Sequence, residues 1–136
     1  MYSKLIEKLN YMNKLSIAII LARGGSKRLP RKNIKDLCGK PMINWTIEAA
    51  IKSNCFSRIL VSTDDKEIQS IAVEAGAEVP FLRDSGSDDH TPSSEATLIA
   101  LNQAEQYWLE NYSTVTQLMA NCPLRTSKDI RDSVEN

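Results

Sequence analysis

The chain has 136 residues, about the length of one compact domain, and its 42% hydrophobic and 25% charged content is ordinary for a folded globular protein. Its 17 basic residues cancel its 17 acidic ones, which argues against a dedicated nucleic-acid-binding protein because such proteins carry a clear basic excess. The longest purely apolar run, residues 17–22, is too short to cross a bilayer. We therefore expect no nucleic-acid partner and no membrane partner.

The cysteines and the single histidine limit the chemistry further. Cys38, Cys55 and Cys122 are widely spaced and form no CxxC pair, which indicates reduced thiols rather than a disulfide framework or a zinc ribbon. Residues 1–14 lack the continuous apolar segment and cleavage site of a signal peptide, so we expect a cytoplasmic protein. Because His90 is the only histidine, a multi-histidine metal site is excluded.

The hydrophobic pattern alternates between strands and helices along the chain. In chain order, its first half predicts a helical segment at residues 1–14, a strand at 15–21, a polar loop at 22–40, a helix from Pro41 through Ile51, a strand at 58–62 and a helix from a cap at Asp64 through Ala75. Its second half predicts a weaker strand at 78–82, a loop at 83–92, a helix from a cap at Ser93 or Ser94 through Trp108, a strand at 114–119 and a helix at 127–134. Gly76 stands where a helix C-terminus favours a left-handed residue.

Strands that alternate with helices imply βαβ crossovers and a mainly parallel sheet. We therefore expect an α/β fold, a three-layer sandwich with helices on both faces of the sheet. Residues 1–13 form an expected N-terminal extension, and residues 14–136 form the expected domain. Because the chain stops within a predicted helix just after a strand, we expect this domain to be incomplete at its carboxyl end.

The loop after the first strand predicts a phosphate site, because ligands of open parallel sheets bind at the carboxyl ends of the strands. Gly24 and Gly25 let backbone N–H groups approach an anion, and Ser26 adds a hydrogen-bond donor. Residues 23–40 contain seven basic residues and one acidic residue, which supply charge-assisted hydrogen bonds. A solvated basic loop is the alternative. An RNA-binding patch is disfavoured because no aromatic residues are interleaved with the cations, and the GxxxxGK[ST] and GxGxxG motifs are both absent.

Three further loops follow the remaining predicted strands. Residues 62–65, Ser-Thr-Asp-Asp, are most simply a helix cap with acids that complement the helix dipole. Residues 83–94 contain an arginine, several hydroxyl groups and a helix N-terminus, which suit a ribose or a phosphate, although turn and cap chemistry explains them equally well. In residues 120–125, only Arg125 is an obvious anion ligand.

Taken in order, these stretches resemble the acylneuraminate cytidylyltransferase family, which includes the CMP-sialic acid synthetases and their relatives for bacterial nonulosonic acids. The residues that carry the resemblance are IILARGGSKRLPRKNI at 19–34, GKPMI at 39–43, VSTDDKEI at 61–68, GAEVPFLR at 76–83 and PLRT at 123–126. The resemblance extends from residue 14 to about residue 130. It implies a Rossmann-like fold of the nucleotide-diphospho-sugar transferase type.

The resemblance also implies an activity, namely transfer of CMP from CTP to the anomeric hydroxyl of an acidic nine-carbon sugar, with release of pyrophosphate. It implies that Arg23 and Lys32 hold phosphates, that Ser26 and Lys27 donate hydrogen bonds, and that Asn33 contacts the nucleotide. The implied catalytic residues are Arg23, Lys27 and Lys32. The implied CTP-binding residues are Ala22, Arg23, Gly24, Ser26, Lys32, Asn33, Arg83, Ser93 and Ser94, of which the last three face the cytidine.

Two departures from the family pattern bear on these expectations. Family members usually have Gln-Pro-Thr-Ser where this chain has Met119-Ala120-Asn121-Cys122, so a thioether replaces a carboxamide beside the expected base or ribose. The carboxyl-terminal part of family domains, which supplies Mg²⁺-binding aspartates, much of the sugar pocket and the homodimer contacts, lies beyond residue 136. Mg²⁺ is thus implied, with no metal ligand assigned in this chain. The alternatives are a nucleotide-binding module without catalysis and a related nucleotidyltransferase for a different sugar.

Overall fold

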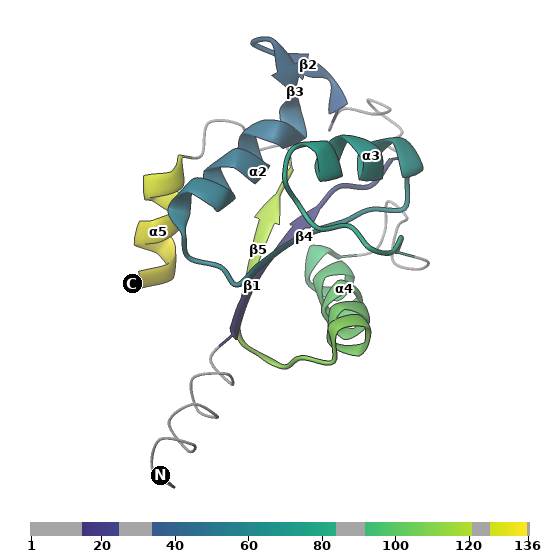
Figure 1. Ribbon diagram of the computed structural model, residues 1–136, viewed down its shortest axis with the longest axis vertical. Coiled ribbons are helices and arrows are strands. Elements are labelled where there is room, and N and C mark those ends of the chain that lie inside the picture. The colour runs from purple at the N-terminus through teal and green to yellow at the C-terminus, as the bar shows by residue number, and fades with distance from the viewer. Residues whose placement is uncertain (1–14, 25–33, 84–91, 121–125, 136) are drawn as a thin grey trace, which may run out of the picture.

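The structure is a computed structural model that describes residues 15–24, 34–83, 92–120 and 126–135 (Figure 1). The expected helical extension before residue 14 lies outside the described residues. In the part of the chain that the structure describes, no helix is long and apolar enough to cross a membrane.

Three parallel strands form the central sheet, in the order β4-β1-β5. They are β1 (Leu15–Leu21), β4 (Arg58–Ser62) and β5 (Tyr112–Met119). β1 lies in the middle, and its last residue pairs with Ser62 on one side and with Met119 on the other. The carboxyl ends of all three strands therefore lie side by side at one edge of the sheet, where α/β proteins bind ligands.

Helices cover both faces of the sheet, so the expected three-layer α/β sandwich is confirmed (Figure 1). The helices are α2 (Met42–Ser53), α3 (Lys66–Glu74), α4 (Ser93–Trp108) and α5 (Ser127–Glu135). Side chains of β1 alternate between the two layers. Ala18 and Ile20 pack in a core with α2, α3 and α5, whereas Ile17, Ile19 and Leu21 pack against α4.

The segment predicted as a weak strand at 78–82 is not a strand in the structure. Glu78 makes a single parallel bridge with Leu60 of β4, in which its N–H donates to the Ile59 carbonyl at 2.9 Å. Pro80 follows two residues later and has no N–H to continue a ladder of hydrogen bonds. The prediction of a strand was therefore wrong, although the segment lies along the outer edge of β4.

The structure also corrects the start of the helix predicted from Pro41. Pro41 was expected in the first turn of a helix, but it ends β3 (Lys40–Pro41) and precedes α2. β3 pairs antiparallel with β2 (Asp36–Leu37), so a small hairpin interrupts the expected loop at 22–40. Its two-residue turn has Cys38 at φ 51° and Gly39 at φ 94°, and positive φ at both positions is typical of a tight hairpin.

Capping also differs at two helices. α3 begins after Asp65 rather than Asp64, because the Asp65 carboxylate accepts the N–H groups of Glu67 and Ile68 at 2.8 and 3.1 Å. Ser93 is the first residue of α4 and Pro92 occupies the cap position, so neither Ser93 nor Ser94 caps this helix. Pro92 cannot supply a side-chain acceptor, and proline favours the extended backbone that precedes a helix.

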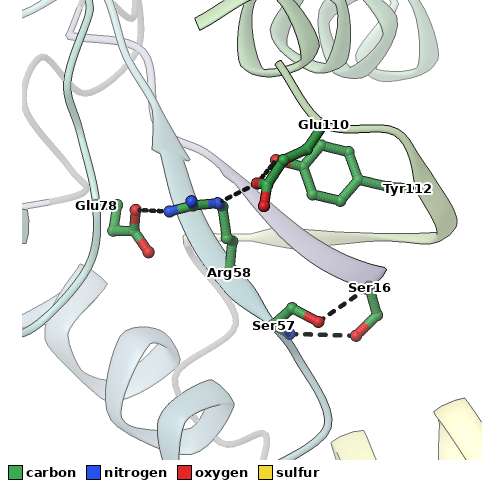
Figure 2. A network of polar contacts seen from close by, with 6 residues as sticks. All are labelled: Ser16, Ser57, Arg58, Glu78, Glu110 and Tyr112. Carbon is green, nitrogen blue, oxygen red and sulfur yellow. Dashed lines mark hydrogen bonds and ion pairs between the residues drawn. The ribbon is translucent and has the colours of Figure 1, made fainter. Parts of the chain in front are cut away.

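A polar network joins the amino-terminal ends of β4 and β5, far from the carboxyl edge of the sheet (Figure 2). The Arg58 guanidinium donates to Glu78 at 2.6 Å and to Glu110 at 2.5 Å, and it lies 4.1 Å from the centre of the Trp108 ring. The Tyr112 hydroxyl donates to the same Glu110 oxygen at 2.9 Å. The hydrogen bond from Arg58 lowers the pKa of Glu110, which therefore stays ionised in this network.

Candidate functional site

The loop that follows β1 is fixed at its start by backbone hydrogen bonds. The Ala22 N–H donates to the Ser62 carbonyl at 3.0 Å, and the Ala22 side chain is completely buried. A ligand contact from Ala22 would therefore use its carbonyl oxygen. On the other side, the Ala120 N–H donates to the Leu21 carbonyl at 3.4 Å, which keeps the end of β5 beside the same loop.

Gly24 lies directly against the loop that follows β4. Its N–H donates to Asp64 Oδ1 at 2.8 Å. A Cβ atom at this position would lie 2.6 Å from Asp65 Oδ2 and 2.7 Å from Asp65 Cβ, closer than real carbon atoms approach. Glycine is thus required here by the close approach of the two loops rather than by a left-handed backbone.

Arg83 is buried at the same edge of the sheet, with a residue exposure of 4%. Its N–H donates to the Thr63 carbonyl at 2.8 Å, and its Nη1 donates to Ser62 Oγ at 3.0 Å. Its Nε is buried and has no hydrogen-bond partner among the described residues. Such a donor is rare in folded proteins, and its N–H is available to a water molecule or a ligand.

The charges around Arg83 show which side chains lie near it. Burial lowers the pKa of Arg83, the negative charge of Asp64 counteracts this shift, and the positive charge of Arg23 adds to it. Arg83 nevertheless stays charged, since arginine is not deprotonated in proteins. Arg23 and Arg83, which are 60 residues apart in sequence, therefore contribute positive charge to one place, with Asp64 beside them.

The start of α4 is tied to β5. The Thr97 hydroxyl, in the first turns of α4, lies 2.8 Å from the Ser93 carbonyl oxygen and 2.8 Å from Gln117 Oε1 on β5. Ser93 and Ser94 are exposed at the amino end of the helix, where backbone N–H groups and the helix dipole favour an anion.

Met119 ends β5 beside Leu21 of β1, at the same edge. Its side chain is 37% exposed, and its Sδ lies 3.7 Å from Gln117 Nε2. Gln117 and Met119 are two residues apart in a strand, so both side chains point to the face that α4 covers. A carboxamide is thus present on this face, two residues before the position where a family member usually has one.

Comparison with known proteins identifies the family. A family model described as cytidylyltransferase matches residues 17–136. The chain belongs to the cytidylyltransferase family. This result confirms the resemblance drawn from the sequence motifs.

Among curated relatives, the pseudaminic acid cytidylyltransferase of Campylobacter jejuni serotype O:2 is 44% identical to this chain over 115 residues, which cover 85% of the chain and 49% of the relative. The CMP-N,N'-diacetyllegionaminic acid synthase of Legionella pneumophila is 43% identical over 119 residues, which cover 88% and 51%. N-acylneuraminate cytidylyltransferase A of Danio rerio is 38% identical over 118 residues, which cover 87% and 26%. The chain spans about half the length of the two bacterial relatives.

Two solved structures share the fold of this chain. A CMP:2-keto-3-deoxy-manno-octonic acid synthetase complexed with CTP matches with a TM-score of 0.69 and 25% identity, over 90% of this chain and 46% of that one. A cytidylyltransferase from Leptospira borgpetersenii matches with a TM-score of 0.72 and 24% identity, over 90% and 48%. Both matches agree with the Rossmann-like fold expected from the sequence.

The structure brings together only some of the expected site residues. Ala22, Arg23, Gly24 and Arg83 gather where the carboxyl ends of β1 and β4 lie side by side. Ser93 and Ser94 lie at the start of α4. The remaining expected residues, Ser26, Lys27, Lys32 and Asn33, lie outside the described residues. Their roles, like those of the residues that the structure describes, remain predictions.

Sequence reasoning missed the part that Asp64 plays at this site. The Ser-Thr-Asp-Asp stretch was interpreted as a helix cap, and Asp65 indeed caps α3, but Asp64 contacts the first loop instead. The available signal was the pair of adjacent acids, of which one suffices for a cap. Among the described residues, no group of three or more His, Cys, Asp or Glu side chains fits a metal ion, so no Mg²⁺ ligand is assigned.

Proposed function

We propose that this chain is the nucleotide-binding part of an enzyme that transfers CMP from CTP to an acidic nine-carbon sugar and releases pyrophosphate. The observation that carries the proposal is the convergence of Arg23, Gly24 and the buried Arg83 at the carboxyl edge of a parallel sheet. Membership of the cytidylyltransferase family supports it. The names of these three relatives point to the acceptor, because each includes a nonulosonic acid of the sialic-acid type.

The proposed reaction needs positioning and charge more than covalent chemistry from the protein. The sugar hydroxyl attacks the α-phosphorus of CTP, the bond from that phosphorus to the bridging oxygen of pyrophosphate breaks, and the hydroxyl proton leaves to solvent or a base. Cations that hold the triphosphate in line and stabilise the leaving pyrophosphate lower the barrier. We assign this role to Arg23, Lys27 and Lys32, with Ser26 and Asn33 as further contacts.

Arg83, which lies near Arg23, and the start of α4 supply the remaining contacts of the proposed site. The Nε–H of Arg83, which has no hydrogen-bond partner among the described residues, is a donor for a ribose or base oxygen, or for a phosphate. Ser93 and Ser94 add hydroxyl groups at the end of a 16-residue helix whose dipole favours negative charge. We therefore propose that these three residues bind the cytidine part of CTP, together with the carbonyl of Ala22.

Several further properties belong to this proposal. The reaction would use Mg²⁺, which in phosphoryl chemistry neutralises charge on the phosphate oxygens. The described residues offer no set of ligands that fits this ion, so no step is derived through it. We propose a homodimer for the complete enzyme and a cytoplasmic location. A nucleotide-binding module without turnover is the second candidate, since the chain spans about half the length of its bacterial relatives.

Titration of the chain with CTP, and with ATP and GTP as controls, tests the proposed function. We expect preferential binding of CTP that Arg23→Ala and Arg83→Ala each weaken at least tenfold. Arg131→Ala is the matched control, because Arg131 is exposed on α5 and its loss leaves affinity unchanged. Pyrophosphate release with CTP and a panel of nine-carbon and eight-carbon acidic sugars then separates the enzyme from a binding module. Equal affinity for all three nucleotides would refute the assignment to CTP.

A further inference from the structure

The two adjacent acids after β4 have different partners. Asp65 caps α3 through its carboxylate, which accepts the N–H groups of Glu67 and Ile68. Asp64 makes no contribution to that cap. Instead, its Oδ1 accepts the N–H of Gly24, 40 residues earlier in the chain, at 2.8 Å.

The Asp64 carboxylate therefore links the two loops that form the cationic side of the site. Its partner is the backbone of the residue that follows Arg23, so the bond restrains the direction in which the chain leaves β1. On the side of β4, Asp64 follows Thr63, whose carbonyl accepts the N–H of Arg83 at 2.8 Å. One short loop thus holds both arginine-bearing segments, through the side chain of Asp64 and the backbone of Thr63.

Charge gives a second reason for a carboxylate at this place. Arg23 and Arg83 are close enough for their like charges to interact, and the negative charge of Asp64 offsets this interaction at Arg83. Repulsion between two cations is strongest where water is partly excluded, and Arg83 is almost completely buried. Without Asp64, the segment after β1 and the segment around Arg83 would repel one another until an anion bound between them.

We propose that Asp64 is a positioning residue of the nucleotide site, which holds the Gly24 backbone and the two arginines in place before the triphosphate binds. The inference rests on the proposed function. Asp64 acts through other residues and makes no contact with the substrate. A preformed site binds more tightly than one that must be ordered on binding, because the ordering cost has already been met by folding.

Two substitutions separate the hydrogen bond from other effects of the side chain. Asp64→Asn keeps an oxygen that accepts the Gly24 N–H, whereas Asp64→Ala removes it. We expect Asp64→Ala to weaken binding of CTP and of inorganic tripolyphosphate about tenfold. We expect Asp64→Asn to weaken it by only about threefold, because the amide keeps the acceptor but loses the negative charge that offsets the two arginines. Asp132→Ala, which removes an exposed acid on α5, is the matched control and leaves both affinities unchanged.

Backbone amide exchange of Gly24, followed by NMR, gives a readout that does not depend on the ligand. Exchange at Gly24 is expected to accelerate in Asp64→Ala and to stay slow in Asp64→Asn. Unchanged or tighter binding of CTP by Asp64→Ala would overturn the inference. Unchanged affinity would show that Asp64 has no effect on binding, and tighter binding would show that its charge repels the phosphate. Equal weakening by both variants would overturn the assignment to the hydrogen bond.

These results can be told apart from failure of the proposed function. Tripolyphosphate binding that Asp64→Ala weakens, with no preference for CTP over ATP, would support the role of Asp64 and contradict the assignment to CTP. Selective CTP binding that Asp64→Ala leaves intact would support the proposed function and overturn the role of Asp64.

Discussion

Replacement of Gly24 by alanine tests the close approach of the two loops. The new Cβ would lie 2.6 Å from Asp65 Oδ2, 2.7 Å from Asp65 Cβ and 3.0 Å from Asp65 Cγ. Rotation of the Asp65 side chain can move its oxygen away but cannot move its Cβ, so one backbone must shift. Gly24→Ala is therefore expected to separate the loops rather than to cause a local change of rotamer.

The magnitude follows from the contacts that such a shift breaks. The Gly24 N–H to Asp64 bond involves a charged acceptor and is worth about 1.5–3 kcal/mol, and the Asp65 cap of α3 is worth about 1 kcal/mol. Since both are weakened rather than abolished, we expect a loss of about 2–3 kcal/mol in the free energy of unfolding. For a chain of this length, that corresponds to a drop in Tm of roughly 6–12 °C. Affinity for CTP is expected to fall at least tenfold.

Differential scanning calorimetry measures the loss of stability, and a CTP titration measures the loss of binding. Gly39→Ala is the control, because Gly39 has φ 94° and no atom within 4 Å of its Cβ position. This variant tests backbone strain alone. We expect it to lower the free energy of unfolding by about 1 kcal/mol and to leave CTP affinity unchanged. The double variant Gly24→Ala, Asp65→Gly removes the clashing Cβ and should recover part of the lost affinity. A Tm for Gly24→Ala within 2 °C of the unmodified chain would show that the loops are not in close contact.

Four further outcomes are expected. Arg58→Gln removes two ion pairs and a stacking contact at the amino ends of β4 and β5. We expect urea denaturation to show a free energy of unfolding lower by about 1–2 kcal/mol, with CTP affinity unchanged. Arg58 lowers the pKa of Glu110, so the stabilisation from Glu110 is complete above the ordinary pKa of a glutamate and is lost as the pH falls through the lowered value. In urea titrations, the free energy of unfolding should therefore fall less between pH 7 and pH 3 in Glu110→Gln than in the unmodified chain. Arg83→Lys keeps the charge but loses the planar group of donors, and calorimetric titration is expected to show CTP binding at least tenfold weaker, a result that wild-type affinity would contradict. Met119→Gln replaces a weak acceptor with a carboxamide, and it is expected to raise the preference for CTP over UTP in competition binding; an unchanged ratio would show that this position does not contact the base.

Much of the sheet was predictable from the sequence, because strands buried on both faces leave a clear pattern. Leu15–Leu21 and Arg58–Ser62 are short segments rich in apolar residues, several of them β-branched, and their predicted bounds match β1 and β4. The segment at 78–82 has the same character but contains Pro80, which prevents a ladder of hydrogen bonds. The hairpin of β2 and β3 was missed because each strand has two residues, too few for any periodicity.

The candidate site was predictable in residue type but not in contacts. The sequence predicts Gly24 as a residue that lets backbone approach an anion, and the structure gives its N–H a carboxylate partner. That contact joins residues 40 positions apart, and no local pattern encodes it. The burial of Arg83 was equally hidden, since arginine is a surface residue by type and only the tertiary structure removes it from water.

The pairing of β1 with two partners has a consequence for the order in which the site assembles. Gly24 follows β1, Asp64 follows β4 and Arg83 ends the segment beside β4, so the cationic side of the proposed site is encoded in residues 15–83. Met119 joins only when β5 pairs with β1, and Met119 lies 98 positions after its partner Leu21. Contacts between nearer segments form sooner. As the chain leaves the ribosome, the proposed anion-binding side can therefore fold while the strand that completes the edge is still being synthesised.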